Sequence, residues 1–147
     1  MIVLIVVLKA RDIMTKDFII LDASTDCLSA AKRMAEHHKG FVIVSRQGKP
    51  AGIVTEWDFL EKIVAAEVDS HSVKLESVMS DPLVYCDMET PTEEAIQLMV
   101  EKGVRRLLVR EGENVVGVIT SRTVLEIFKR YVDEITALVA RFSSTLL

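Results

Sequence analysis

The sequence repeats itself at an offset of 65 residues, and no insertion interrupts the match between Ile13 and Leu125. A repeat constrains the fold more than any local pattern does, because each copy is one structural unit that buries its apolar face against its neighbour. A copy of roughly 55 residues is small for independent folding, so we expect the two copies to pack as a pseudo-twofold pair. Identical residues at this offset are Met14 and Met79, Asp22 and Asp87, Thr25 and Thr90, Ala30 and Ala95, Met34 and Met99, Val44 and Val109, Gly52 and Gly117, Thr55 and Thr120, and Leu60 and Leu125.

The first copy predicts the element order β-α-β-β-α. Alternation between short β-rich runs, a glycine-containing turn and apolar residues at helical spacing gives this order. The expected elements are a strand at 18–21, a helix from 24–26 to about 38, strands at 41–44 and around 53–54 joined by a turn at 46–49, and a helix at about 56–67.

The second copy predicts the same order. Thr90 to Glu93 read Thr-Pro-Thr-Glu, which predicts a capping box with Pro91 at the first helical position. Strands are expected at 106–109 and 115–120, around a turn at 111–114. We therefore expect an α+β fold with an apolar N-terminal strand at 1–8, a first repeat at 9–68, a polar linker at 69–75, a second repeat at 76–131 and a C-terminal helical extension at 132–147.

Composition narrows the class of protein. Half of the residues are apolar and the formal net charge is −4, which disfavours both disorder and general nucleic-acid binding. The apolar run at 1–8 is too short to span a bilayer and lacks the flanking features of a signal peptide. Cys27 and Cys86 have no CxxC spacing, so we expect a reducing, cytoplasmic setting.

Two kinds of segment recur in both copies. The first copy has a lead-in, Arg11–Asp17, and a closing segment, Gly52–Leu60, and the second copy repeats the pattern in Val78–Pro82, Gly103–Val109 and Gly117–Thr120. These segments resemble the CBS domain, the regulatory repeat of the cystathionine β-synthase type. The resemblance covers about residues 9–131. It implies a disc-shaped pair of repeats, a Bateman module, whose clefts hold adenosine-containing ligands such as AMP, ADP, ATP or S-adenosylmethionine. It also implies a sensor of a regulated enzyme, channel or transporter.

The segment Gly52–Asp58 matches the ligand signature of that family. The Thr55 hydroxyl can donate to a phosphate oxygen where a strand gives way to a helix, and the Asp58 carboxylate can accept both ribose hydroxyls. Thr55 and Asp58 also have the spacing of a helix capping box, and the two roles are compatible. The family implies that the segment after Met79 contacts the adenine base. Arg105 and Arg106 either contact a phosphate of the ligand or lie in solvent. The expected nucleotide-binding residues are Gly52, Ile53, Thr55, Asp58, Ser80, Pro82, Leu83, Arg105 and Arg106.

The second copy departs from the signature. Thr123 stands where Asp58 stands in the first copy, and one neutral hydroxyl cannot take two ribose hydroxyls. We therefore expect a second, weaker cleft formed by Thr15, Lys16, Phe18, Val118, Thr120 and Thr123.

The leading functional hypothesis is a stand-alone, non-catalytic module that binds an adenine nucleotide and needs no metal or catalytic cofactor. Familiar catalytic motifs and phosphate-binding glycine loops are absent from the sequence. The alternatives are an adaptor with empty clefts and a sensor of S-adenosylmethionine. Apolar residues spaced 4-3-4-3-4 after the second repeat predict a homodimer, and they are Val124, Phe128, Tyr131, Ile135, Leu138 and Phe142.

Overall fold

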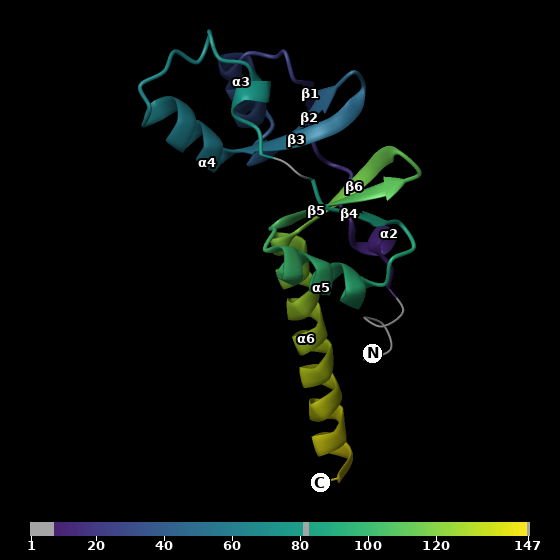
Figure 1. The fold of residues 1–147 in the computed structure, drawn as a ribbon. Coiled ribbons are helices and arrows are strands. Elements are labelled where there is room, and N and C mark those ends of the chain that lie inside the picture. Colours follow the sequence, from purple (N-terminus) through teal and green to yellow (C-terminus); the bar gives the residue numbers. More distant parts are fainter. Residues whose placement is uncertain (1–7, 81–82, 147) are drawn as a thin grey trace. The chain divides into compact units, whose positions relative to one another are not determined.

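The computed structural model describes residues 8–80 and 83–146, which form two compact units (Figure 1). Unit 1 contains residues 8–15, 84–112 and 116–146, and unit 2 contains residues 16–80, 83 and 113–115. The expected N-terminal strand falls almost entirely on residues 1–7, which lie outside the described residues. The α+β class and the two three-stranded sheets confirm the fold that the repeat predicts.

Unit 2 contains the first sheet, whose strand order is β1-β2-β3. Strand β1 runs parallel to β2, and β2 runs antiparallel to β3. Its core combines the apolar side of the sheet with one face of α3 and with residues from the helical segments that follow β3. The elements are β1 (Ile20–Asp22), α3 (Cys27–Glu36), β2 (Phe41–Arg46), β3 (Lys49–Thr55), α4 (Glu56–Phe59), the π-helical turn η1 (Leu60–Val64) and the 3₁₀ turn η2 (Leu75–Ser77).

Unit 1 contains the second sheet, with the order β4-β5-β6, and β4 runs parallel to β5. Its elements are α2 (Ala10–Ile13), β4 (Tyr85–Asp87), α5 (Thr92–Lys102), β5 (Arg106–Glu111), β6 (Asn114–Thr120) and α6 (Ser121–Leu146). Helix α6 is continuous over 26 residues, and Figure 1 shows it running well past α5 and away from the sheet of its unit. Helix α6 therefore continues past residue 131, where the sequence predicts the end of the second repeat. Among the described residues, none of the helices combines the length and the apolar content needed to cross a membrane.

The start of α5 differs from the prediction of a capping box. Pro91 is the N-cap residue and makes no side-chain capping bond. The Thr90 hydroxyl instead accepts a hydrogen bond from the Asp87 amide at 3.1 Å, which closes the turn after β4. The carbonyl oxygen of Leu8 accepts bonds from the amide and the hydroxyl of Thr92, at 2.9 and 2.7 Å. A distant backbone segment therefore satisfies the helix start that a local side chain was expected to cap.

Each lead-in segment packs on the sheet of the other sequence repeat. Met79 belongs to the lead-in of the second repeat, yet its side chain lies against Gly52 of β3, and Met14 of the first lead-in likewise lies against Gly117 of β6. Backbone pairs accompany both contacts, because Ser80 pairs with Ile53 and Thr15 pairs with Val118. The compact units therefore exchange their lead-ins relative to the sequence repeats, and residues 76–80 belong to unit 2.

The contact between Gly52 and Met79 predicts a position that excludes any side chain. A Cβ atom at residue 52 would stand 2.6 Å from the Met79 sulfur and 3.0 Å from its Cβ. We expect Gly52→Ala to lower the free energy of unfolding by about 1–3 kcal/mol, which is the usual cost of overpacking a core. Urea denaturation measures this loss. In the double variant with Met79→Ala the two losses should be clearly less than additive, and strict additivity would show that the methionine does not impose the glycine.

Candidate ligand site

The signature residues of the first repeat lie where β3 gives way to α4 in unit 2. Thr55 is the N-cap residue of α4, and its hydroxyl oxygen accepts a bond from the Asp58 amide at 3.4 Å. The Asp58 carboxylate reaches back, where Oδ2 accepts bonds from the Thr55 amide at 2.8 Å and from the Thr55 hydroxyl at 3.0 Å. The structure therefore shows the capping box, with a carboxylate held at the junction of strand and helix.

Lys62 is a functional candidate that the sequence reasoning missed. Its ammonium group donates to Asp58 Oδ1 and to the carbonyl oxygen of Val78, both at 2.7 Å. The lysine lies four residues after the aspartate, on the helical stretch that continues from α4 into η1. That spacing was the available signal, since oppositely charged residues four apart meet on a helix. Its bond to Val78, sixteen residues away in the chain, is not visible in a local pattern.

The Asp58 carboxylate is buried, and the residue is only 6% exposed. It accepts three hydrogen bonds, two at Oδ2 and one at Oδ1. An ionised carboxylate has room for about four, so one acceptor position remains, on Oδ1. A ligand that offers two hydroxyl groups must therefore displace at least one of the present donors.

Ser80 lies beside the signature strand, as its place in the predicted site requires. The Ile53 amide donates to the Ser80 carbonyl at 3.1 Å, and the Ser80 amide donates to the Ile53 carbonyl at 2.9 Å. The structure thus brings Gly52, Ile53, Thr55, Asp58 and Ser80 together within unit 2.

Four residues of the predicted first site remain. Leu83 is half-buried and belongs to unit 2, and Pro82 lies outside the described residues. Arg105 and Arg106 belong to unit 1, where Arg105 is exposed and Arg106 begins β5. Their contribution to ligand binding stays a prediction.

The second junction, between β6 and α6, has a threonine, Thr123, in place of the Asp58 carboxylate. The hydroxyl groups of Thr120 and Thr123 lie 3.1 Å apart, and the Thr123 amide donates to Thr120 Oγ1 at 3.2 Å. Thr15 exchanges two backbone bonds with Val118 alongside. These four residues lie in unit 1, whereas the exposed Lys16 and the half-buried Phe18 belong to unit 2. The two junctions share their backbone form and differ in electrostatics.

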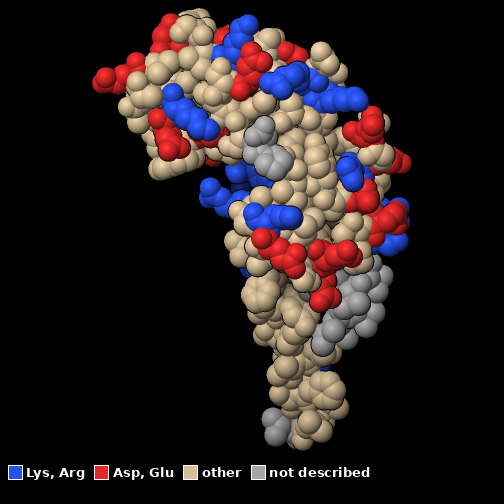
Figure 2. All heavy atoms as spheres, in the orientation of Figure 1, with Lys and Arg blue, Asp and Glu red and all other residues tan. Residues whose placement is uncertain are grey.

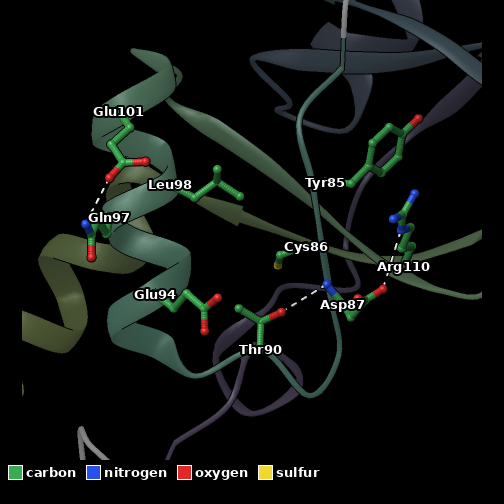
Figure 3. Close-up of a pocket in the computed structure, with 9 residues that line it drawn as sticks. All are labelled: Tyr85, Cys86, Asp87, Thr90, Glu94, Gln97, Leu98, Glu101 and Arg110. Carbon is green, nitrogen blue, oxygen red and sulfur yellow. Dashed lines mark hydrogen bonds and ion pairs between the residues drawn. The ribbon is translucent and has the colours of Figure 1, made fainter.

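A separate hollow lies between β4 and α5, with a volume of about 470 Å³ (Figure 3). Three carboxylates, those of Asp87, Glu94 and Glu101, lie around it, and Arg110 already pairs with Asp87. Such a lining repels a phosphate group. Burial raises the pKa of the Cys86 thiol in its wall to about 11, which keeps the thiol protonated and a weak nucleophile at neutral pH. None of the predicted site residues lines this hollow.

A metal centre has no ligand set within residues 8–80 and 83–146. There, no group of three or more histidine, cysteine, aspartate or glutamate side chains is close enough to hold an ion. The first junction differs from the second by its ion pair, in which Lys62 contacts the buried carboxylate of Asp58.

Comparison with known proteins identifies a family. A model of the CBS domain family matches the sequence twice, over residues 10–65 and 75–130. The chain is 29% identical over 137 residues to the uncharacterized protein MK0525 of Methanopyrus kandleri. This alignment covers 92% of this chain and 70% of that protein. The structure of a hexameric CBS-CP12 protein from bloom-forming cyanobacteria superposes with a TM-score of 0.72 and 30% identity, covering 81% of this chain and 70% of the other.

The fold is also that of the CBS domain pair of protein MJ0100, whose structure is a complex with 5'-methylthioadenosine and S-adenosyl-L-methionine. The TM-score is 0.73 over 84% of this chain and 98% of the other. The identity is 21%, so this likeness establishes the fold and its ligands remain properties of that protein.

The pair of Asp58 and Lys62 predicts a measurable coupling in stability. Asp58→Ala removes the cap and leaves the lysine without its carboxylate, so we expect a loss of about 1–2 kcal/mol in the free energy of unfolding. Lys62→Met keeps the length of the side chain and removes its charge. A double-mutant cycle with thermal or urea unfolding should give a coupling energy of about 1 kcal/mol for this partly buried pair. A coupling near zero would mean that Lys62 does not hold the carboxylate in solution.

Proposed function

Because the chain belongs to the CBS domain family, we propose that it is a regulatory module that binds an adenosine-containing ligand at the Asp58 junction and catalyses no reaction. The observation that carries the proposal is a buried carboxylate at the end of β3, which a threonine hydroxyl and a paired backbone segment flank. Carboxylates accept hydrogen bonds from vicinal hydroxyl groups such as those of ribose, and buried ones do so strongly.

Binding at this site exchanges one set of hydrogen bonds for another. The Thr55 hydroxyl now donates to Asp58 Oδ2, and on binding it turns to a ligand phosphate. That rotation frees an acceptor position on Oδ2, and Oδ1 already has one free beside Lys62. The carboxylate then accepts hydrogen bonds from both ribose hydroxyls and retains its ion pair with Lys62. No buried donor or acceptor is left without a bond in this exchange.

Lys62 favours an anionic ligand among the adenosine compounds. Its ammonium group lies 2.7 Å from the carboxylate that would hold the ribose, so it adds a positive charge next to the site. This charge offsets the negative charge of Asp58, so the junction does not repel the phosphates of AMP, ADP or ATP as an unpaired carboxylate would, and it gives the sulfonium of S-adenosylmethionine no unpaired anion. We therefore place the adenine nucleotides first. The predicted base contacts of Pro82 and Leu83 and the phosphate contacts of Arg105 and Arg106 belong to the same proposal.

The Thr120–Thr123 junction is proposed as the weaker site. Its hydroxyl groups already bond to each other and to the backbone, and it has no carboxylate for the ribose. A reducing, cytoplasmic setting for the module is consistent with Cys27 and Cys86, which are both free thiols.

The ligand proposal predicts binding in the micromolar range, or roughly −8 kcal/mol. With AMP, ADP or ATP at a hundredfold excess over the dissociation constant, linkage adds about 2.7 kcal/mol to stability and raises the melting temperature by several degrees. Calorimetry and thermal melting on protein freed of co-purified ligand measure both effects. If neither an adenine nucleotide nor S-adenosylmethionine produces heat or a shift, the proposed function is wrong.

Variants of the two junctions locate the ligand. Asp58→Ala should weaken nucleotide binding about 10- to 100-fold, because bonds to a charged acceptor contribute roughly 1.5–3 kcal/mol. Thr123→Ala is the matched control at the second junction and should change affinity much less. A variant Asp58→Ala that melts lower but binds as tightly as the wild type would reduce Asp58 to a helix cap.

The proposal includes a homodimer, because α6 exposes large apolar side chains along most of its length. Ile135→Glu puts a charge among them and should convert the dimer to a monomer. Ala137→Glu adds the same charge two residues away on the same helix and should leave the dimer intact. Light scattering at micromolar concentration gives the mass of each. Two monomeric variants, or a monomeric wild type, would refute this assembly.

A further inference from the structure

Helix α6 exposes seven large apolar residues whose spacing alternates strictly between three and four. They are Leu125, Phe128, Val132, Ile135, Val139, Phe142 and Leu146, and we call them the α6 seam. Phe142 and Leu146 are 63% and 80% exposed. The row predicted from sequence shares Phe128, Ile135 and Phe142 with the seam. Its other members, Val124, Tyr131 and Leu138, are half-buried, so the exposed row lies one residue further along.

The α6 seam is not the face by which the helix packs on its own unit. Within the described residues, Ile127 is the buried side chain of α6, and it joins the core of unit 1. Ile127 lies about 100° around the helix from Phe128 and about 160° from Leu125, at roughly 100° per residue. The seven side chains are 37–80% exposed, which amounts to roughly 700 Å² of apolar surface, on the order of one side of a standard interface of about 800 Å² per partner.

The strict three-four alternation indicates another helix as the partner. An average repeat of 3.5 residues keeps apolar side chains facing a second helix through a left-handed supercoil, and a flat surface imposes no such period. Figure 2 shows few charged side chains on the side of the C-terminal half of α6 that it displays. The α6 seam of a second copy of this chain has the same length and the same period.

We propose that two copies pair through the α6 seam in antiparallel orientation, with Phe142 of one helix opposite Val132 of the other. This inference rests on the proposed homodimer and adds its direction and register. In this register Ile135 lies opposite Val139, and Phe128 lies opposite Leu146. Each layer of the interface then combines a larger side chain with a smaller one or two of intermediate size.

The volumes of these layers select the antiparallel direction. In a parallel, in-register pair, the layers of two phenylalanines at 128 and 142 would adjoin the layers of two valines at 132 and 139. Such a pair alternates wide and narrow layers and leaves voids at the valines, each about the size of a methyl group or more and costing about 1 kcal/mol. The antiparallel register keeps the layers nearly equal in volume. It also places the positive N-terminal end of each helix dipole beside the negative C-terminal end of the other, which is favourable near the helix ends.

An apolar hollow on unit 1 is consistent with this direction. It has a volume of about 410 Å³, and its lining includes Val100 of α5 and Val124 and Leu125 of α6. Val100 is 75% exposed. The antiparallel register brings the C-terminal end of the second α6, with its Leu146, to the N-terminal end of the first, where this hollow lies. In a parallel pair that end would lie at the opposite end of the helix.

Disulfide trapping distinguishes the two directions. In the proposed register, residue 132 of one copy lies about 15 Å along the axis from residue 132 of the other, far beyond the roughly 7 Å limit for a disulfide. The double variant Val132→Cys/Phe142→Cys should therefore form a covalent dimer under mild oxidation. Each single variant should not. The native Cys27 and Cys86 are buried and stay in place.

The outcomes separate the direction from the dimer itself. Single variants that cross-link as well as the double variant would establish a parallel pair and overturn the inference. A wild-type dimer by light scattering with no cross-link in any variant would place the interface elsewhere or in another register, and either result would overturn the inference. A monomeric wild type would refute the homodimer first. The pair Phe128→Cys/Leu146→Cys repeats the test at the other end of the register, should a cysteine at residue 142 impair folding.

Discussion

In each unit a methionine side chain lies directly on a glycine of the last sheet strand, and the rest of the architecture follows from this contact. Met79 can approach Gly52 so closely only because the strand has no Cβ there. The contact fixes the next residue, Ser80, in backbone pairing with Ile53. It also sets the position of the Val78 carbonyl, which accepts a bond from Lys62. One close approach therefore ties the lead-in, the strand and the helix of the candidate site together.

This arrangement explains how a charged carboxylate stays buried at the Asp58 junction. An isolated buried charge would be costly, but two donors from Thr55 and one from Lys62 satisfy it. The same donors are exchangeable, because a hydroxyl rotates and a lysine stem is flexible. The site is thus stable without a ligand and adaptable to one. The neutral Thr123 at the other junction needs fewer hydrogen bonds, and its hydroxyl and amide both bond to Thr120 Oγ1.

Sequence reasoning recovered what local periodicity encodes and missed what distant segments supply. The strands, the two sheets and the run of α6 follow from the repeat and from apolar spacing. The start of α5 depends on the Leu8 carbonyl, and Lys62 depends on Val78, so no local pattern reveals either contact. The seam was predicted one residue out of place over half of its members because spacing alone does not show which row faces solvent.

The two copies diverge at the end of their last helix, and a single pair of residues shows why. In the first copy the helix ends at Val64, and Glu67 follows with a positive φ of 55°. The equivalent residue of the second copy is Val132. A β-branched residue is strongly disfavoured at positive φ, so the chain cannot turn there and continues as helix. The same valine then becomes a member of the α6 seam. The copy with the aspartate therefore ends its helix early beside the candidate ligand site, and the copy with a threonine at that position continues into the helix that carries the α6 seam.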